Sequence, residues 1–254
     1  MTSFQPLRSN ILGSPFDNLS KSATLARIEE SLKLKQFMQH CVINVAKVIH
    51  MRKDLALQQA VSSCDLISVD GMGVVWGARF LGIPVTERVA GIDLFFSLLE
   101  LAEKNNHPVF LLGAKAEVLE LAVANLQQRY PQLQIVGNHH GYFWGNEAEI
   151  VDKIRQSGAE MLFVAITSPK KEVFIEHWKS TLGVTFVMGV GGTFDIVAGI
   201  TRRAPLWMQK NGLEWFFRAL QEPRRMWQRY FLTNTLFLFA LLNEKLKLLL
   251  QPPK

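Results

Sequence analysis

Cysteine is scarce in this sequence, since the 254 residues include only Cys41 and Cys64. Neither has a Cys or His partner at the spacing of metal ligands, so the two predict neither a disulfide framework nor a zinc site. This low cysteine content is typical of a protein in a reducing compartment. The opening residues are polar and broken by prolines, without the apolar segment of a secretory signal. The sequence is therefore not typical of a secreted protein.

Long hydrophobic runs and paired aspartates are missing as well. The longest uninterrupted apolar run after residue 200, Leu236 to Leu242, has seven residues, whereas a membrane-spanning helix needs about twenty. No two of the seven aspartates lie two residues apart, so there is no D-x-D pair to hold a divalent ion on a sugar-nucleotide diphosphate. We therefore expect no metal and no other cofactor, and we expect arginines to neutralise any bound diphosphate.

The net charge of +6 is unevenly distributed along the chain. Residues 202–254 contain ten Lys or Arg and three Glu, a net charge of +7, which leaves about −1 for the residues before them. A nearly neutral body with a basic, aromatic-rich tail predicts an anionic partner for the tail: nucleic acid, a phosphorylated substrate or a membrane surface. The body offers no continuous basic track, which argues against nucleic acid.

The hydrophobic pattern alternates short β-rich runs with longer amphipathic stretches. Apolar runs of this kind, separated by helices of about ten to sixteen residues, are typical of parallel strands buried on both faces. The runs are CVINV, DLISVD, PVFLLGA, LQIVG, EMLFVAI and VTFVMGVGG, and the predicted helices between them are 46–61, 92–104, 116–129, 147–156 and 170–178. The pattern predicts an α/β fold in which a Rossmann-like parallel sheet is layered with helices. We expect this core in residues 1–200 and a C-terminal helical appendage in residues 201–254.

Polar or glycine-rich sequence follows several predicted strands, where an open parallel sheet binds its ligands. Asp70 follows one strand directly and precedes a glycine, so the pattern fits either a catalytic base or a helix cap in an Asp-Gly turn. Another strand leads into a loop containing Gly189, Gly191 and Gly192, followed by Asp195. This loop suits a diphosphate, and it also suits a plain tight turn. The pattern alone leaves both pairs of alternatives open.

Several segments together resemble the WecG/TagA/CpsF family of bacterial glycosyltransferases, glycosyltransferase family 26. They occur in the family's order over about residues 10 to 235: DGMGVVWGARFLG, ERVAGIDLF, VFLLGAK, NHHGYF, SPKKE, GVGGTFDIVAG, RAPLWMQKNGLEWFFR and QEPRRMWQRY. The resemblance implies an inverting transfer of a sugar, by default N-acetylmannosamine, from a UDP-sugar donor to a sugar on a polyprenyl diphosphate. Such a protein would work in cell-surface polysaccharide synthesis. Because the tail in residues 201–254 is basic and aromatic-rich but has no spanning run, we expect it to associate with the membrane, as part of a peripheral protein on the cytoplasmic face.

The resemblance also assigns roles to residues. Asp70 matches the family's candidate base, and Asn44 and Arg88 match residues near the acceptor, although an ion pair is an equally open role for Arg88. In the family's T-x-N segment the threonine is Val42 here, and in its P-K-Q-E segment the glutamine is Lys171. Both departures bear on which donor and acceptor are used. Lys171, Gly191, Gly192 and Asp195 are the expected donor-binding residues.

The basic tail supplies candidates for stabilising the diphosphate: Arg218, Arg224, Arg225 and Arg229. In a helix that begins at Pro223, Arg225 and Arg229 share a face, so they can approach one diphosphate together, or they can attract anionic lipid instead. Two other functions stay open, a sugar-nucleotide-binding scaffold without catalysis and, less favoured, a nucleic-acid-binding module. The sequence leaves the oligomeric state undecided, a homo-oligomer included.

Overall fold

The structure is a computed structural model that describes residues 8–250, apart from the side chains of Arg225, Met226 and Arg229. Six strands form a parallel sheet in the order β4-β3-β8-β7-β5-β6. They are β3 (Met38–Ile43), β4 (Leu66–Val69), β5 (Val109–Gly113), β6 (Ile135–His139), β7 (Met161–Ala165) and β8 (Phe186–Gly189). A separate antiparallel hairpin precedes them, formed by β1 (Arg8–Ile11) and β2 (Ser14–Asp17).

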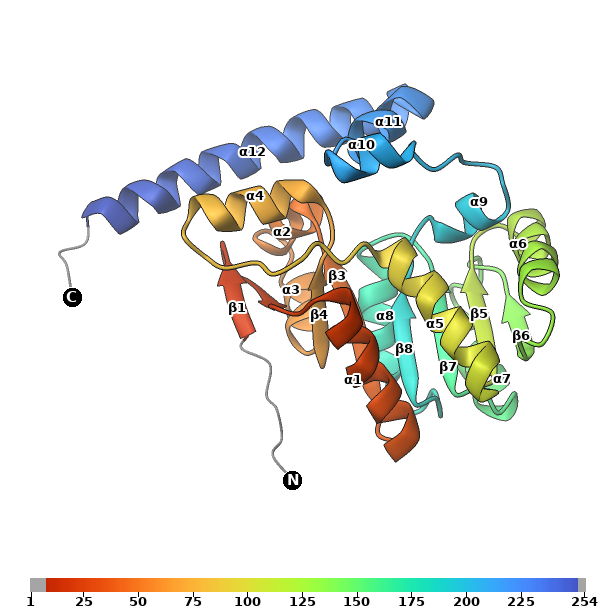
Figure 1. The fold of residues 1–254 in the computed structure, drawn as a ribbon. Helices are drawn as coiled ribbons and strands as arrows, with labels where there is room; N and C mark the ends of the chain where they lie inside the picture. The colour runs from red at the N-terminus through yellow and green to blue at the C-terminus, as the bar shows by residue number, and fades with distance from the viewer. Residues whose placement is uncertain (1–7, 251–254) are drawn as a thin grey trace.

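Helices cover both faces of the sheet (Figure 1). One face packs against α1 (Lys21–Leu34), α5 (Gly91–Asn105), α6 (Ala116–Arg129) and the short α9 (Thr193–Val197). The other packs against α2 (Val45–Met51), α3 (Leu55–Ser62), α4 (Met72–Phe80), α7 (Glu147–Gln156) and α8 (Lys170–Trp178). The predicted α/β architecture is thus confirmed.

The strands form where apolar runs lie between two helical layers. Every residue of β4, β5, β7 and β8 is buried, as expected for parallel strands covered on both sides. The prediction of one helix over 46–61 is wrong, because α2 ends at Met51 and α3 begins at Leu55. The break occurs at Asp54, whose side chain accepts a hydrogen bond from the Leu57 N–H at 3.0 Å and caps α3.

The tail folds into three helices, α10 (Leu206–Lys210), α11 (Glu214–Gln221) and α12 (Pro223–Leu250). In Figure 1 they lie across the side of the molecule toward which the strand arrowheads point. Phe237 and Leu241 of α12 are buried, and they pack against α4 so closely that a Cβ at Gly77 would meet both side chains. The tail therefore shares a hydrophobic core with the sheet. Among residues 8–250 no helix is long and apolar enough to cross a membrane.

Candidate functional site at the carboxyl edge of the sheet

Three strand ends bring the main site candidates to one edge of the sheet. β3 is hydrogen-bonded to β4 on one side and to β8 on the other. Because all three strands are parallel, their carboxyl ends meet at the same edge, where Asn44 follows β3, Asp70 follows β4 and Gly191 lies just beyond β8. The sequence prediction that Asp70 and the glycine loop follow strands of one parallel sheet is confirmed.

Asp70 lies in the turn between β4 and α4. Gly71 has a φ of 102°, a left-handed conformation that permits the turn without a Cβ clash. The Asp70 Oδ2 accepts a hydrogen bond from the Gly91 N–H at 3.2 Å, at the start of α5. Burial raises the pKa of Asp70 above its ordinary value, although the Gly91 N–H and the charge of Arg88 act in the opposite direction. The N-cap position of α4 is occupied by Gly71, and no side chain in the described part of the chain caps this helix. Asp70 is therefore not the helix cap that the sequence pattern left open.

Asn44 caps α2, since its Oδ1 accepts a hydrogen bond from the Lys47 N–H at 3.0 Å. Its Cβ lies 3.8 Å from the position that a Cβ on Gly71 would occupy, so Asn44 stands beside the Asp70 turn. Val42 is also close, with a methyl 3.7 Å from the position of a Cβ on Gly91, next to the Asp70 carboxylate. The position at which the resemblance predicts a threonine hydroxyl therefore presents a methyl group to this edge.

A chain of ion pairs joins α11 to the core beside Asp70. The Arg88 Nη1 lies 2.6 Å from the Glu214 Oε2. The Glu214 Oε1 in turn lies 3.4 Å from the Arg203 Nε, and Arg203 makes two hydrogen bonds to the Asp93 carboxylate, at 2.6 and 2.9 Å. The ion-pair role left open for Arg88 is thus present, with a partner from the tail. Acceptor binding by Arg88 stays a prediction.

The glycine loop after β8 receives an arginine from the tail. A Cβ at Gly192 would collide with the Arg218 guanidinium and would lie 3.5 Å from the Asp195 Oδ2. Gly191 has a φ of 56°, which again favours glycine. The Arg218 Nε is buried and has no hydrogen-bond acceptor among the described residues. An unsatisfied buried donor is costly, so this arrangement suits an anionic ligand between α11 and the loop.

Lys171 lies in a buried ion cluster that the sequence did not predict. Its Nζ lies 2.8 Å from the Glu172 Oε1, and the Lys47 Nζ lies 2.7 Å from the same oxygen. Burial alone would raise the pKa of Glu172, but the two ammonium groups outweigh it and hold that pKa at about 2. Burial lowers the pKa of Lys171. The Lys171 stem packs on Gly189 at the end of β8, so its charge is already paired close to the glycine loop.

The remaining arginine candidates lie at the start of α12. Arg224 is exposed, and the structure gives it no contact with the glycine loop. The side chains of Arg225 and Arg229 lie outside the described part of the chain, so their predicted convergence on a diphosphate stays a prediction. Of the four arginines proposed from the sequence, Arg218 is the one that the structure places at the strand ends.

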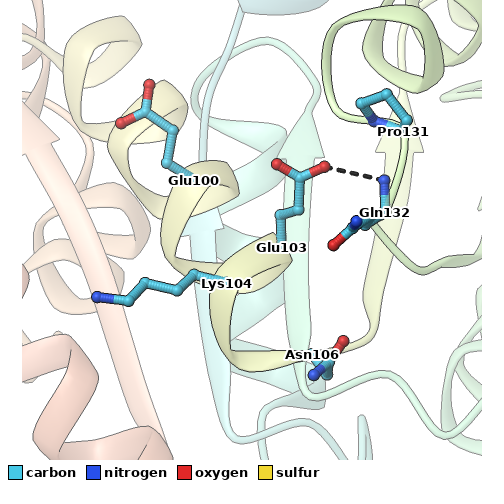
Figure 2. Close-up of a pocket in the computed structure, with 6 residues that line it drawn as sticks. All are labelled: Glu100, Glu103, Lys104, Asn106, Pro131 and Gln132. Atoms are coloured by element: carbon cyan, nitrogen blue, oxygen red, sulfur yellow. Dashed lines mark hydrogen bonds between the residues drawn. The ribbon is translucent and has the colours of Figure 1, made fainter.

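A surface hollow of about 600 Å³ lies away from this edge (Figure 2). It is formed by the end of α5 and the segment before β6, and Glu103 there accepts a hydrogen bond from the Gln132 N–H at 2.9 Å. No residue that the sequence proposed for the site lines this hollow. Within residues 8–250, no group of three or more His, Cys, Asp or Glu residues is arranged to hold a metal ion.

Comparison with known proteins gives a consistent match. Residues 9–251 match the model of the glycosyl transferase WecG/TagA/CpsF family. A Bacillus spizizenii protein is 36% identical over 172 residues, which cover 68% of this chain and 66% of the relative. A Staphylococcus aureus protein is 32% identical over 244 residues, 94% of each chain. Both relatives are named N-acetylglucosaminyldiphosphoundecaprenol N-acetyl-beta-D-mannosaminyltransferase.

Proposed function

The chain belongs to the glycosyl transferase WecG/TagA/CpsF family, and on that premise we propose which sugar it transfers, and to what. The donor is a UDP-sugar, by default UDP-N-acetylmannosamine. The acceptor is N-acetylglucosamine linked through a diphosphate to a polyprenol, and the transfer inverts the anomeric carbon. The names of the relatives support the transferred sugar and the lipid-linked acceptor, and the glycine loop with Arg218 supports a diphosphate donor.

The position and environment of Asp70 are the observation that carries this proposal. Its carboxylate stands at the edge where three strand ends meet, and burial raises its pKa, which makes it a better proton acceptor than an ordinary aspartate. Oδ2 is held by the Gly91 N–H, while Oδ1 accepts no hydrogen bond from any described residue. In the proposed reaction Oδ1 takes the proton of the acceptor hydroxyl as that oxygen attacks the anomeric carbon, and UDP leaves from the opposite face.

Arg218 takes the second role in the proposed reaction, at the leaving group. As the bond to UDP breaks, negative charge grows on the β-phosphate, and a guanidinium held beside it stabilises that charge. Arg218 comes from α11, which the Arg88–Glu214 ion pair fastens to the Asp70 side of the core. Asn44 and Arg88 would then contact the acceptor, and Gly191, Gly192, Asp195 and Lys171 the donor.

The tail has a third proposed role, binding of the protein to the cytoplasmic face of a membrane. Helical periodicity places eight apolar side chains of α12 on the side away from the buried Thr233, Phe237 and Leu241. Each of the eight is more than half exposed: Phe231, Leu232, Leu238, Phe239, Leu242, Leu246, Leu249 and Leu250. We call this set the outer face of α12. An exposed apolar helix face in a basic segment is typical of an interfacial membrane helix.

Incubation with a panel of UDP-sugars and a soluble, short-chain analogue of the lipid-linked acceptor tests the transfer, with the products identified by mass spectrometry. We expect a product that gains one N-acetylhexosamine from UDP-N-acetylmannosamine. Binding of UDP-sugars without transfer or hydrolysis from any of them would favour the non-catalytic scaffold. Salt-sensitive binding of oligonucleotides would instead revive the nucleic-acid function.

A further inference from the structure

A groove of about 200 Å³ lies between α2 and α12, away from the proposed site of transfer. It is lined by Ile49, Arg52, Lys53, Leu236, Phe239, Ala240 and Asn243. α2 begins beside Asp70 at the Asn44 cap and ends at Met51, so the groove lies at the far end of that helix, roughly 10 Å along its axis. Nothing in the proposed transfer uses it.

The groove combines an apolar floor with two cations. Ile49 is buried, and Leu236 and Ala240 are partly buried, whereas Arg52 and Lys53 are exposed. Across the described residues, neither Arg52 nor Lys53 takes part in an ion pair or a side-chain hydrogen bond. The adjacent carboxylate, Asp54, is occupied in capping α3. Two unpaired cations above an apolar floor match a ligand with an anionic head and an apolar body.

The groove borders the outer face of α12, and Phe239 belongs to both. Helical periodicity puts Leu236, Ala240 and Asn243 on the flank between the outer face and the face that packs on the core. Lys247 continues this flank toward the end of α12, with Glu244 3.9 Å from its Nζ. If the outer face enters a bilayer, this flank lies at the depth of the lipid phosphates.

We propose that the groove binds the headgroup of one anionic phospholipid of the bilayer on which the protein docks. Arg52 and Lys53 contact the phosphate, and the glycerol and first acyl carbons lie against Leu236 and Phe239. The inference rests on the proposed membrane role of α12 and adds a contact from the core. A helix face alone fixes depth and leaves rotation about the helix free. A second contact on α2 removes that freedom and fixes the Asp70 edge relative to the lipid-linked acceptor.

The test compares two double variants of the full chain. Arg52→Ala with Lys53→Ala removes the two cations of the groove, and Lys33→Ala with Lys104→Ala removes the same charge from exposed positions on α1 and α5. Helices α1 and α5 both end on the side of the molecule opposite α12 (Figure 1). Sedimentation is measured with vesicles of phosphatidylcholine alone and of phosphatidylcholine mixed with phosphatidylglycerol. Melting temperature and transfer to the soluble acceptor are measured alongside.

We expect the groove variant to bind mixed vesicles about 10- to 30-fold more weakly than wild type, and its preference for anionic over neutral vesicles to fall by the same factor. The control variant should stay within about twofold of wild type, and both should keep wild-type melting and soluble transfer. Equal losses in the two variants would overturn the proposal, because they would show attraction by net charge alone. A wild-type protein that binds no vesicle at all would overturn the membrane role and this inference together. A wild-type protein that binds vesicles but transfers no sugar to the soluble acceptor would contradict only the proposed catalysis.

Discussion

The ionised Asp70 carboxylate should lower the stability of the folded protein, and replacing Asp70 by asparagine should remove that loss. Because its pKa is raised on folding, the ionised carboxylate is destabilising above that pKa, and the cost vanishes below the ordinary value, where both states are protonated. Asp70→Asn keeps an oxygen for the Gly91 N–H. We therefore expect the variant to melt at or above the wild-type temperature at neutral pH, with the difference closing below pH 3.8. A variant that melts well below wild type at neutral pH would contradict this environment.

Disturbing the buried Lys47–Glu172–Lys171 ion cluster should lower the free energy of unfolding more than disturbing an exposed ion pair does. Glu172→Gln removes the carboxylate that pairs with both buried ammonium groups, a loss of about 3–5 kcal/mol in the free energy of unfolding. Glu149→Gln, in an exposed pair with Lys153, is the matched control and should cost under about 1 kcal/mol. Denaturant unfolding measures both.

The same cluster should make stability depend on pH in the acid range. The pKa of Glu172 is lowered from 4.5 to about 2, so its contribution is complete above pH 4.5 and is lost as the pH falls toward 2. In Glu172→Gln this part of the pH dependence should be absent. Similar costs for Glu172→Gln and Glu149→Gln would show that the buried cluster contributes little.

For single residues, sequence reasoning found those that directly follow strands and missed those whose position depends on packing between distant segments. Asp70 was predictable because a polar residue directly after a buried strand must lie at the sheet edge, whereas Asn44 was named through the family resemblance alone. Lys47 was not predicted, although a lysine within the apolar segment VAKVIHM was an available signal. The contact between Arg218 and Gly192 joins segments that only the tertiary fold brings together.

At the scale of elements, α12 has two apolar sides with different roles, and two phenylalanines separate them. Phe237 is 3% exposed and Phe239 is 61% exposed. Phe237→Ala should cost about 3–5 kcal/mol of stability because it leaves a cavity against α4, whereas Phe239→Ala should cost little and weaken sedimentation with vesicles. Thermal melts and vesicle binding of both variants check this. If Phe239→Ala bound vesicles as wild type does, the outer face would not be the membrane surface.

The limits of the helix predictions also have a local cause. Hydrophobic periodicity carried the predicted helix through 46–61, since apolar residues continue on both sides of the break. The chain instead starts a new helix after Asp54, because the Asp54 side chain accepts a hydrogen bond from the backbone N–H of Leu57. The membrane role of α12 could be proposed from composition, but the side that faces the core could not, because Gly77 of α4 selects it through close packing.

For the whole molecule, the layered α/β class followed from the alternation of strands and helices, whereas the strand order did not. Placing β8 between β3 and β7 depends on contacts between segments far apart in the sequence. This placement brings the glycine loop next to the Asp70 edge, so the site depends on the order of strands as much as on its residues.

Transfer by the whole protein should not require a divalent ion. With no D-x-D pair in the sequence, we assign neutralisation of the diphosphate to arginines, so activity should survive excess EDTA within about twofold. The assay is transfer to the soluble acceptor with and without EDTA, followed by addition of Mg²⁺ or Mn²⁺. Loss of activity in EDTA that either ion restores would show that carboxylates outside those named here bind a metal.

Catalysis of sugar transfer by Asp70 is tested most directly in a single-turnover assay. Wild type and Asp70→Asn are each mixed in excess over UDP-N-acetylmannosamine with the soluble diphosphate-linked N-acetylglucosamine acceptor, and the disaccharide product is followed by mass spectrometry. We expect wild type to form the product and Asp70→Asn to form it about 10²-fold or more slowly, with unchanged affinity for UDP. A rate for Asp70→Asn within a few-fold of wild type would contradict the assignment of Asp70 as the base.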